Sequence, residues 1–168
     1  MIFDLSSKIT LERIPTRYYR TSDPVEAIRQ TRYEKLRTEI YETDTEGSAV
    51  VAREIATLIR AKAEKGLACV LGIPGGSTPM KVYKELVKLH QREGLSFKNV
   101  FIFNVNEFFP VRTKQHSNGK ILREYLINKV DLPEGHFFTP DESITRDNVF
   151  EFCQNYEAKI EELGGLDY

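Results

Sequence analysis

Two short, continuous apolar runs constrain the fold of this chain more than any other feature of its sequence. The first, LACVLGI, covers residues 67–73 and is bounded by Gly66 and Pro74, and the second, VFIFNV, covers residues 100–105. A strand that is covered by helices on both faces has no side turned to water, so its sequence is apolar throughout instead of alternating. Both runs therefore predict buried strands of a parallel sheet.

Segments with apolar residues at helical spacing flank these runs. Within residues 50–65 the apolar positions recur every three or four residues, Ser48 before them is a candidate N-cap, and Gly66 stops the pattern. After the first run, Thr78 is a candidate N-cap and Pro79 occupies the first helical position, where its missing N–H costs nothing. Both segments are predicted to be helices that pack on the sheet.

The second half of the chain continues the alternation with weaker signals. Residues 116–132 are typical of a loop that leads into a helix, and residues 136–139 are a weaker strand candidate, as are residues 38–41. Asp147 is predicted to cap a last helix that ends at the pair Gly164-Gly165. This alternation predicts an α/β fold, with a doubly wound, mostly parallel sheet of the Rossmann type and helices on both faces. The apolar stripe of the last helix would comprise Val149, Phe150, Cys153, Tyr156 and Ile160.

The first 33 residues differ from the rest of the chain. Pro15 and Pro24 interrupt their short apolar patches, and several arginines make the stretch locally basic. We interpret residues 1–33 as an N-terminal extension on the surface of an α/β domain at residues 34–168. A basic interaction tail is the alternative interpretation of the same arginines. A length of 168 residues suits one domain of this kind, or a part of a longer chain.

Charge and composition argue against several classes of function. Lys and Arg total 24 against 25 Asp and Glu, so the net charge of −1 lacks the basic excess of a nucleic-acid-binding protein. No run of about 18 apolar residues occurs, so no membrane-spanning helix is predicted. The two cysteines, Cys69 and Cys153, match no metal-ligand spacing and form no disulfide framework, which suits a reducing, cytoplasmic location.

Small and hydroxyl residues follow the first predicted strand, at the end where open α/β sheets bind their ligands. Gly75 and Gly76 allow backbone N–H groups to approach a ligand, and the hydroxyls of Ser77 and Thr78 stand at a predicted helix N-terminus. This arrangement favours a phosphate, because free N–H groups and the helix dipole attract an anion. A tight strand-to-helix turn with a threonine cap is the alternative. The Walker spacing and its lysine are missing, which excludes a nucleotide P-loop.

Polar side chains also follow the second predicted strand. Asn104, Asn106 and Glu107 lie within four residues of one another. Glu107 is a candidate general base or partner of a cation, and Asn106 can exchange hydrogen bonds with a sugar hydroxyl. A solvated loop with an asparagine turn is the alternative. Neither segment identifies an enzyme by itself.

Taken together, residues 71–110 resemble a known family. They read LGIPGGSTPMKVYKELVKLHQREGLSFKNVFIFNVNEFFP, which combines a G-S-T-P loop, a helix with Y-K-x-L, the connector L-S-F-K-N-V and a strand that runs into a motif close to D-E-[YF]. This combination resembles the N-terminal half of the glucosamine-6-phosphate deaminase family, which includes related sugar-phosphate isomerases. The resemblance covers residues 36–168 and is weaker beyond His116, through residues 130–133, Tyr156 and Ile160.

The resemblance implies roles for particular residues. Residues 75–78 would meet the phosphate or the ring-facing hydroxyls of a sugar phosphate, although Gly75 replaces the family's usual threonine. Asn106 stands where the family has the aspartate that moves a proton between C1 and C2 of the sugar. An amide has no basic lone pair near neutral pH, so Asn106 cannot perform that step. Glu107 would point to the opposite face of a regular strand.

The resemblance also implies a function in amino-sugar phosphate metabolism. In this family the ring of glucosamine 6-phosphate opens, aldose becomes ketose and ammonia leaves to give fructose 6-phosphate, without a metal or an organic cofactor. The family's next strand and its ring-opening motif G-H-I-x-F-N-E-P do not occur before Tyr168. We therefore expect the N-terminal part of a longer parent chain, inactive alone. Its expected partners are a small-molecule sugar phosphate, the rest of that parent chain and, in a homo-oligomer, further copies.

A second hypothesis is a regulatory or accessory domain that binds a sugar phosphate and has lost isomerase chemistry. Asn106 is the direct argument for it, and residues 117–120 also depart from the family, which commonly has proline and a Ser-Tyr pair there. The two hypotheses differ in whether the full-length chain carries the histidine and glutamate of the ring-opening motif. A nucleotide-binding domain is a weaker third interpretation, because G-x-G-x-x-G is missing.

Overall fold

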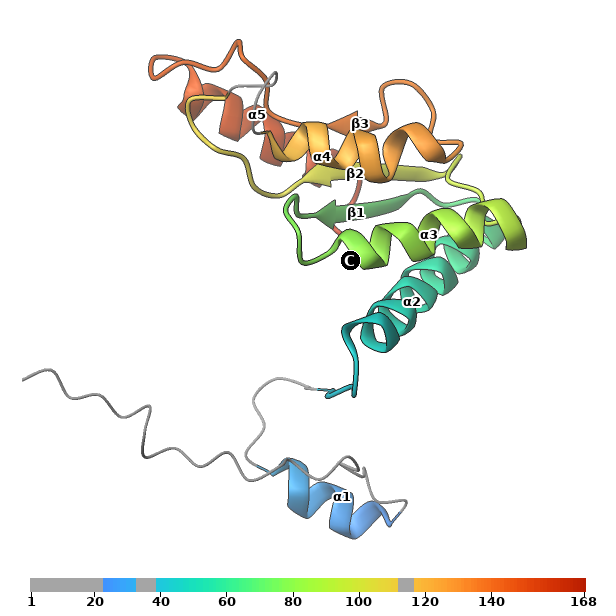
Figure 1. Cartoon of the computed structure of the whole chain (residues 1–168). Helices are drawn as coiled ribbons and strands as arrows, with labels where there is room; N and C mark the ends of the chain where they lie inside the picture. The colour runs from blue at the N-terminus through green and yellow to red at the C-terminus, as the bar shows by residue number, and fades with distance from the viewer. Residues whose placement is uncertain (1–22, 33–38, 112–116) are drawn as a thin grey trace, which may run out of the picture. The chain divides into compact units, whose positions relative to one another are not determined.

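The structure is a computed structural model that describes residues 23–32, 39–111 and 117–168 (Figure 1). The chain divides into two units, residues 1–43 and 44–168, and each is described by itself. Among the helices in the described ranges, none is both long enough and apolar enough to cross a membrane.

The first unit contains a helix, α1 (Pro24–Thr31), that the sequence did not predict. Asp23 is its N-cap, and the Asp23 carboxylate accepts a hydrogen bond from the N–H of Val25 at 2.9 Å. Pro24 therefore occupies the first position of this helix. Residues 1–22 and 33 of the predicted extension lie outside the described residues. Residues 39–41 form no strand, which corrects that prediction, and Thr38 lies outside the described residues.

The second unit is built on a three-stranded parallel sheet. Its strands are β1 (Cys69–Ile73), β2 (Val100–Asn104) and β3 (Phe137–Phe138), in the order β1-β2-β3. In the register, Leu71 lies opposite Ile102, and Ile102 lies opposite Phe137. The predicted parallel strands are confirmed, and β3 covers only residues 137–138 of the predicted 136–139.

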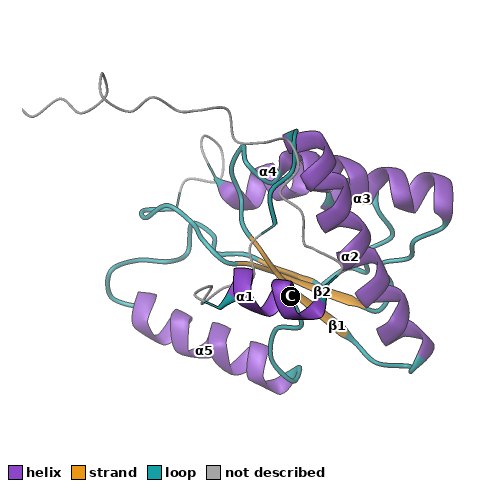
Figure 2. Cartoon of the chain, turned by 90° about the horizontal axis from the view of Figure 1, so that it is seen from below, coloured by secondary structure: helices purple, strands orange, loops and turns teal. Residues whose placement is uncertain are grey.

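Helices cover both faces of the sheet, as the sequence predicted (Figure 2). The helices α2 (Asp44–Glu64), α3 (Met80–Glu93) and α4 (Asn118–Tyr125) lie on one face, and the short 3-10 helix η1 (Ile127–Lys129) follows α4. The helix α5 (Val149–Glu162) lies on the other face. The fold is therefore a doubly wound α/β arrangement.

The main core lies between the sheet and the first of these helix layers. Alternate strand residues such as Leu71 and Ile102 point into it and are almost fully buried. They pack against helix residues that recur at helical spacing, which is why the sequence shows both periods. The buried helix side chains of this core include Ile55, Ile59, Tyr83, Leu86 and Leu122.

The layer formed by α5 is thinner. Tyr156 packs edge-on against Phe103 at 5.3 Å between ring centres, but no residue of α5 is fully buried. Phe150 is 74% exposed and Cys153 is also exposed, so the predicted apolar stripe turns only partly inward. The helix α5 begins after Asn148 and not after Asp147, the predicted cap. The Asn148 side chain accepts a hydrogen bond from the Thr145 N–H, in the preceding turn, at 2.7 Å.

Two predicted helix starts are corrected as well. The helix α2 begins at Asp44, so Ser48 lies inside the helix and donates its hydroxyl to the Asp44 carbonyl, four residues earlier, at 2.6 Å. The helix α3 begins at Met80, and Thr78 makes no capping hydrogen bond. Residues 77–79 form a turn, in which the Met80 N–H reaches the Ser77 carbonyl at 3.4 Å.

Candidate functional site

The carboxyl ends of β1 and β2 bring the two polar segments of the sequence side by side. Ile73 lies opposite Asn104 in the register, and the Val105 N–H donates to the Ile73 carbonyl at 3.1 Å. The chain leaves β1 into residues 74–79 and leaves β2 into residues 105–110 at the same edge of the sheet. This edge is where a doubly wound sheet binds its ligands.

The loop of residues 75–78 keeps its hydrogen-bond donors free. Within the described part of the chain, the N–H groups of Gly76, Ser77 and Thr78 have no acceptor, and the two hydroxyls have no partner. Gly76 has a φ of +104°, a conformation that side chains rarely adopt, and Ser77 and Thr78 are exposed. Free N–H groups at the start of a helix favour a negatively charged ligand.

Two tyrosines, the buried Tyr83 and the half-buried Tyr156, hold the strand ends from opposite faces of the sheet. The Tyr83 hydroxyl on α3 donates to the carbonyl of Pro74, just before the 75–78 loop. The Tyr156 hydroxyl on α5 lies 3.1 Å from the carbonyl of Asn104 and 2.9 Å from that of Phe138. Burial raises the pKa of both tyrosines, so both remain neutral donors.

Asn106 is joined directly to the 75–78 loop. The N–H of Gly75 donates to Asn106 Oδ1 at 3.2 Å, and the side-chain amide of Asn118 donates to the backbone carbonyl of Asn106 at 2.9 Å. Asn106 itself is exposed. The two segments that the sequence singled out therefore meet through one side chain.

Glu107 has a structural position that the sequence analysis missed. Its carboxylate accepts hydrogen bonds from the Ser117 hydroxyl at 3.0 Å and from the N–H groups of Asn118 and Gly119, both at 2.9 Å. It therefore binds the N-terminus of α4, where a negative charge is favourable. The Glu107 carboxylate is therefore not free to act as a general base. Ser117, a good N-cap before the helical apolar spacing of α4, was the available signal.

Asn118 packs directly over Gly75. A Cβ atom placed on Gly75 would come within 2.2 Å of the Cβ of Asn118 and within 2.4 Å of its amide oxygen. Asn118 is only 4% exposed, so it has little room to move aside. The missing side chain of Gly75 therefore leaves room for Asn118.

A pocket of about 450 Å³ opens beside the 75–78 loop. It extends from Gly76 along α4, with Phe108 and Ile121 as apolar walls. Lys120 and Glu124 line it as well and form an ion pair at 3.9 Å. The space next to the 75–78 loop therefore has both apolar and charged walls. His116, which belongs to the resemblance, lies outside the described residues.

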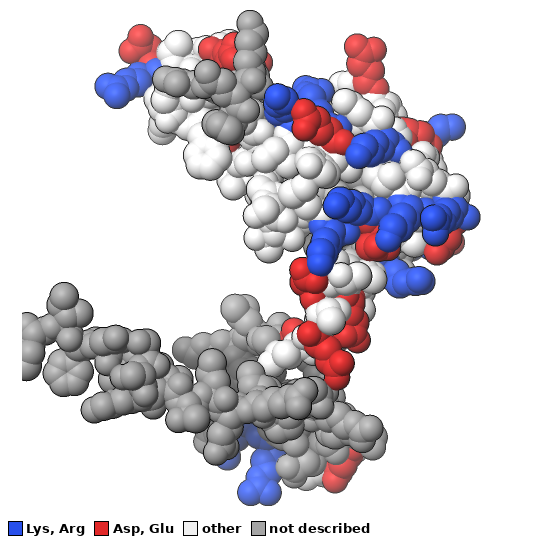
Figure 3. All heavy atoms as spheres, in the orientation of Figure 1, with Lys and Arg blue, Asp and Glu red and all other residues white. Residues whose placement is uncertain are grey.

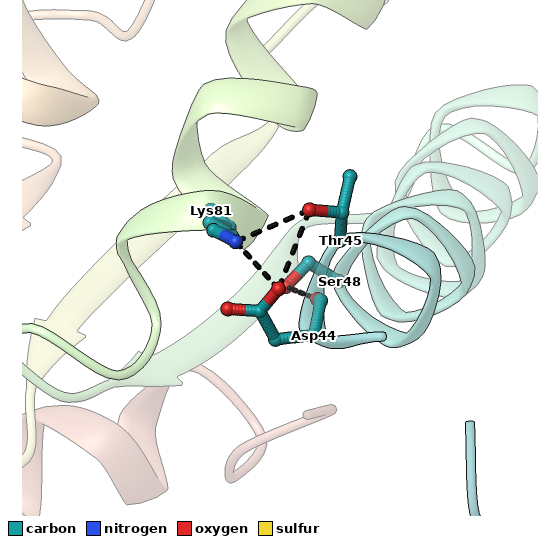
Figure 4. A network of polar contacts seen from close by, with 4 residues as sticks. All are labelled: Asp44, Thr45, Ser48 and Lys81. Atoms are coloured by element: carbon teal, nitrogen blue, oxygen red, sulfur yellow. Dashed lines mark hydrogen bonds and ion pairs between the residues drawn. The ribbon is translucent and has the colours of Figure 1, made fainter. Parts of the chain in front are cut away.

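Lysine and arginine residues gather along α3, directly after the 75–78 loop (Figure 3). The first of them, Lys81, is committed to α2, because its ammonium group donates to Asp44 and to the hydroxyl of Thr45 at 3.1 Å (Figure 4). The hydrogen bond from Lys81 holds the pKa of Asp44 below its ordinary value.

Among the described residues, no group of three or more His, Cys, Asp or Glu could hold a metal ion.

Known proteins resemble the chain over the same residues. The family model of glucosamine-6-phosphate isomerases/6-phosphogluconolactonase matches residues 42–167. A glucosamine-6-phosphate deaminase-like protein of Bacteroides thetaiotaomicron is 46% identical over 98% of this chain and 25% of its own length. Glucosamine-6-phosphate deaminase 2 of Giardia intestinalis is 35% identical over 73% of this chain and 44% of its own length. The chain thus spans less than half of each of these relatives.

Solved structures share the fold. A monomeric glucosamine-6-phosphate deaminase of the NagB superfamily superposes with a TM-score of 0.67 at 29% identity, over 74% of this chain and 50% of its own. A 6-phosphogluconolactonase from Thermotoga maritima superposes with a TM-score of 0.56 at 22% identity, over 68% of this chain and 50% of its own.

Proposed function

The chain belongs to the glucosamine-6-phosphate isomerase/6-phosphogluconolactonase family, and on that premise we propose that its 75–78 loop binds the phosphate group of a sugar phosphate. The observation that carries this proposal is the set of free donors in the loop. Within the described residues, three neighbouring N–H groups and two hydroxyls lack a partner at the start of α3. A phosphate supplies the acceptors and the negative charge that such a site favours.

For the whole protein we propose a role in amino-sugar phosphate metabolism. The names of its relatives support glucosamine 6-phosphate as the substrate, with isomerisation and release of ammonia to give fructose 6-phosphate. In this proposal the described site contributes phosphate binding and the position of Asn106. The remaining groups would come from the rest of a longer parent chain. No metal or organic cofactor is required.

A second candidate function is binding of the sugar phosphate without isomerisation. Two observations favour it: the position next to the loop holds the amide of Asn106, and the neighbouring carboxylate of Glu107 is bound to the start of α4. A full-length protein with Asn106→Asp separates the two candidates. Gain of ammonia release would support an altered enzyme, whereas no gain in a folded variant would favour the binding domain.

A titration monitored by NMR tests the phosphate proposal. Addition of inorganic phosphate or glucosamine 6-phosphate should shift the amide signals of Gly76, Ser77 and Thr78, with dissociation constants in the millimolar range. Ser77→Ala and Thr78→Val each remove one hydroxyl donor and should weaken binding by about threefold to tenfold. Unchanged amide signals at tens of millimolar phosphate would leave only a strand-to-helix turn.

The cellular location and the oligomeric state of the protein are also proposals. We propose a cytoplasmic protein, which its two free cysteines support, since one of them is exposed and unpaired. Self-association stays a prediction, and one solved relative is described as monomeric. Sedimentation of the full-length protein tests the assembly.

A further inference from the structure

The side-chain amide of Asn106 has a defined orientation. The Gly75 N–H is 3.2 Å from Asn106 Oδ1, and an N–H group can bond only to an acceptor. The oxygen of the amide therefore faces the loop. Its NH2 group must point away from Gly75, on the other side of the same planar group.

Neighbouring contacts hold the backbone on both sides of this hydrogen bond. Asn118, nearly fully buried, donates to the backbone carbonyl of Asn106 at 2.9 Å and packs on Gly75. Gly75, Asn106 and Asn118 thus form a closed ring of contacts that joins the end of β1, the end of β2 and the start of α4. Rotation of the Asn106 amide would place its NH2 group against the Gly75 N–H, donor against donor.

The NH2 group of Asn106 makes no hydrogen bond within this ring of contacts. Within the described residues it donates to no acceptor, and Asn106 is exposed. The other polar groups nearby are occupied, because Asn104 donates to Thr139 at 3.1 Å and Glu107 accepts from the start of α4. A ligand on the 75–78 loop would therefore meet one additional free donor at the neighbouring strand end.

We propose that Asn106 is a specificity-determining residue that donates a hydrogen bond to a hydroxyl or carbonyl oxygen of a phosphorylated sugar. This proposal rests on phosphate binding at the 75–78 loop and deepens it. An aspartate at this position would offer only acceptors and would add a negative charge close to the phosphate. The neutral amide instead favours a ligand that carries acceptor oxygens near its phosphate, and it holds that ligand without removing a proton.

The test follows the side-chain NH2 signals of Asn106 by NMR, assigned by their loss in Asn106→Asp. Fructose 6-phosphate should shift the loop amides and the Asn106 NH2 signals, whereas inorganic phosphate should shift the loop amides alone. Asn106→Leu removes the donor without adding charge, but it also removes the acceptor of the Gly75 N–H, so it should weaken fructose 6-phosphate by about threefold to tenfold more than it weakens inorganic phosphate.

A matched control and a comparison of two Asn106 variants complete the test. Asn128→Asp adds the same charge in η1, beyond the far end of α4, and should leave both affinities unchanged. In Asn106→Asp, binding of fructose 6-phosphate should be weaker than in Asn106→Leu at pH 7, because charge repulsion adds to the lost donor. Chemical shifts of the unliganded variants show whether each retains its fold.

The outcomes separate this inference from the proposed function. Loop amides that shift with fructose 6-phosphate while the Asn106 NH2 signals stay fixed would overturn the inference and leave phosphate binding standing. Equal loss of both ligands in a folded Asn106→Leu would overturn it too, because it would show that Asn106 only supports the loop. No shift at the loop with either ligand would overturn both proposals.

Discussion

Gly75 illustrates how one neighbour can decide the residue at a position. Its φ is not in the left-handed region, so the backbone by itself would accept a side chain. The obstacle is Asn118, whose Cβ lies 2.2 Å from the position that a Cβ of Gly75 would take. The two residues are 43 positions apart in the sequence, so this constraint comes only from packing.

We predict that Gly75→Ala destabilises the chain by about 1–3 kcal/mol through overpacking against Asn118. Asn118→Ala should also destabilise it, because the hydrogen bond to the Asn106 carbonyl is lost. The double variant should be more stable than the sum of the two effects predicts. Urea unfolding of the four proteins measures this coupling, and strict additivity would contradict the clash.

Glu107 is predicted to act on stability through α4. Glu107→Gln removes the negative charge from the helix N-terminus and should lower the free energy of unfolding by about 1–3 kcal/mol. Glu124→Gln, on the exposed side of the same helix, is the matched control and should change it by less than about 0.5 kcal/mol. Thermal unfolding compares the two variants. Equal effects would show that Glu107 contributes no more than a surface charge.

The two cysteines are predicted to differ in reactivity. Burial, with a smaller effect from the negative charge of Asp167, raises the pKa of Cys69 to about 11, whereas Cys153 is exposed on α5. A thiol-specific reagent at pH 8 should label Cys153 rapidly and Cys69 only after unfolding. Cys153→Ser should abolish the rapid phase and Cys69→Ser should retain it. Rapid labelling of both thiols in the native protein would contradict the burial of β1.

At the scale of elements, Asp131 connects the segment after η1 to the turn before β2. Burial by itself would raise the pKa of Asp131, but hydrogen bonds from the N–H of Phe97 at 2.6 Å and the hydroxyl of Ser96 at 2.8 Å hold it below its ordinary value. The ionised carboxylate thus fixes the chain that leads into the sheet.

This lowered pKa predicts a pH dependence of stability. The contribution of Asp131 is complete above the ordinary carboxyl pKa of about 4 and is lost as the pH falls through the lower value of the folded state. Asp131→Asn should therefore be less stable than the native chain at pH 7, and the difference should shrink below about pH 4. Unfolding in urea at several pH values measures it, with Glu134→Gln as control. A difference that is constant down to pH 2 would exclude this ionisation.

At the scale of the whole molecule, the loop proposed to bind phosphate lies beside the amide of Asn106 instead of a carboxylate. We therefore predict that the 168-residue chain releases no ammonia from glucosamine 6-phosphate, because the amide of Asn106 cannot abstract a proton from carbon. A coupled ammonia assay measures this, with a glucosamine-6-phosphate deaminase of the family as positive control. Release above a buffer blank that Thr78→Val abolishes would contradict the prediction.

The strands and the family were predictable from local sequence. The runs at residues 67–73 and 100–105 are apolar throughout because helices cover both faces of the sheet, and this pattern is visible without coordinates. The residues that follow these runs carried the family resemblance, because the residues of such a loop are close together in the chain and form a short motif.

Helix starts were less predictable because several residues compete for the same role. Ser48, Thr78 and Asp147 are all good caps, yet each helix begins elsewhere. Near α5, Asn148 is used by the preceding turn, and before α3 the chain forms a turn over residues 77–79. Such choices depend on small differences in local hydrogen bonding, which propensity does not resolve.

The sequence by itself determined the α/β class, the order of the main elements and the loop with free donors, since each depends on residues close together in the chain. Only the tertiary structure decided that Glu107 binds the start of α4, that Asn118 fills the space above Gly75, and that the amide oxygen of Asn106 faces the loop. These contacts join residues 10 to 43 positions apart. The contact between Gly75 and Asn106 forms only when parallel strands bring their carboxyl ends to one edge of the sheet.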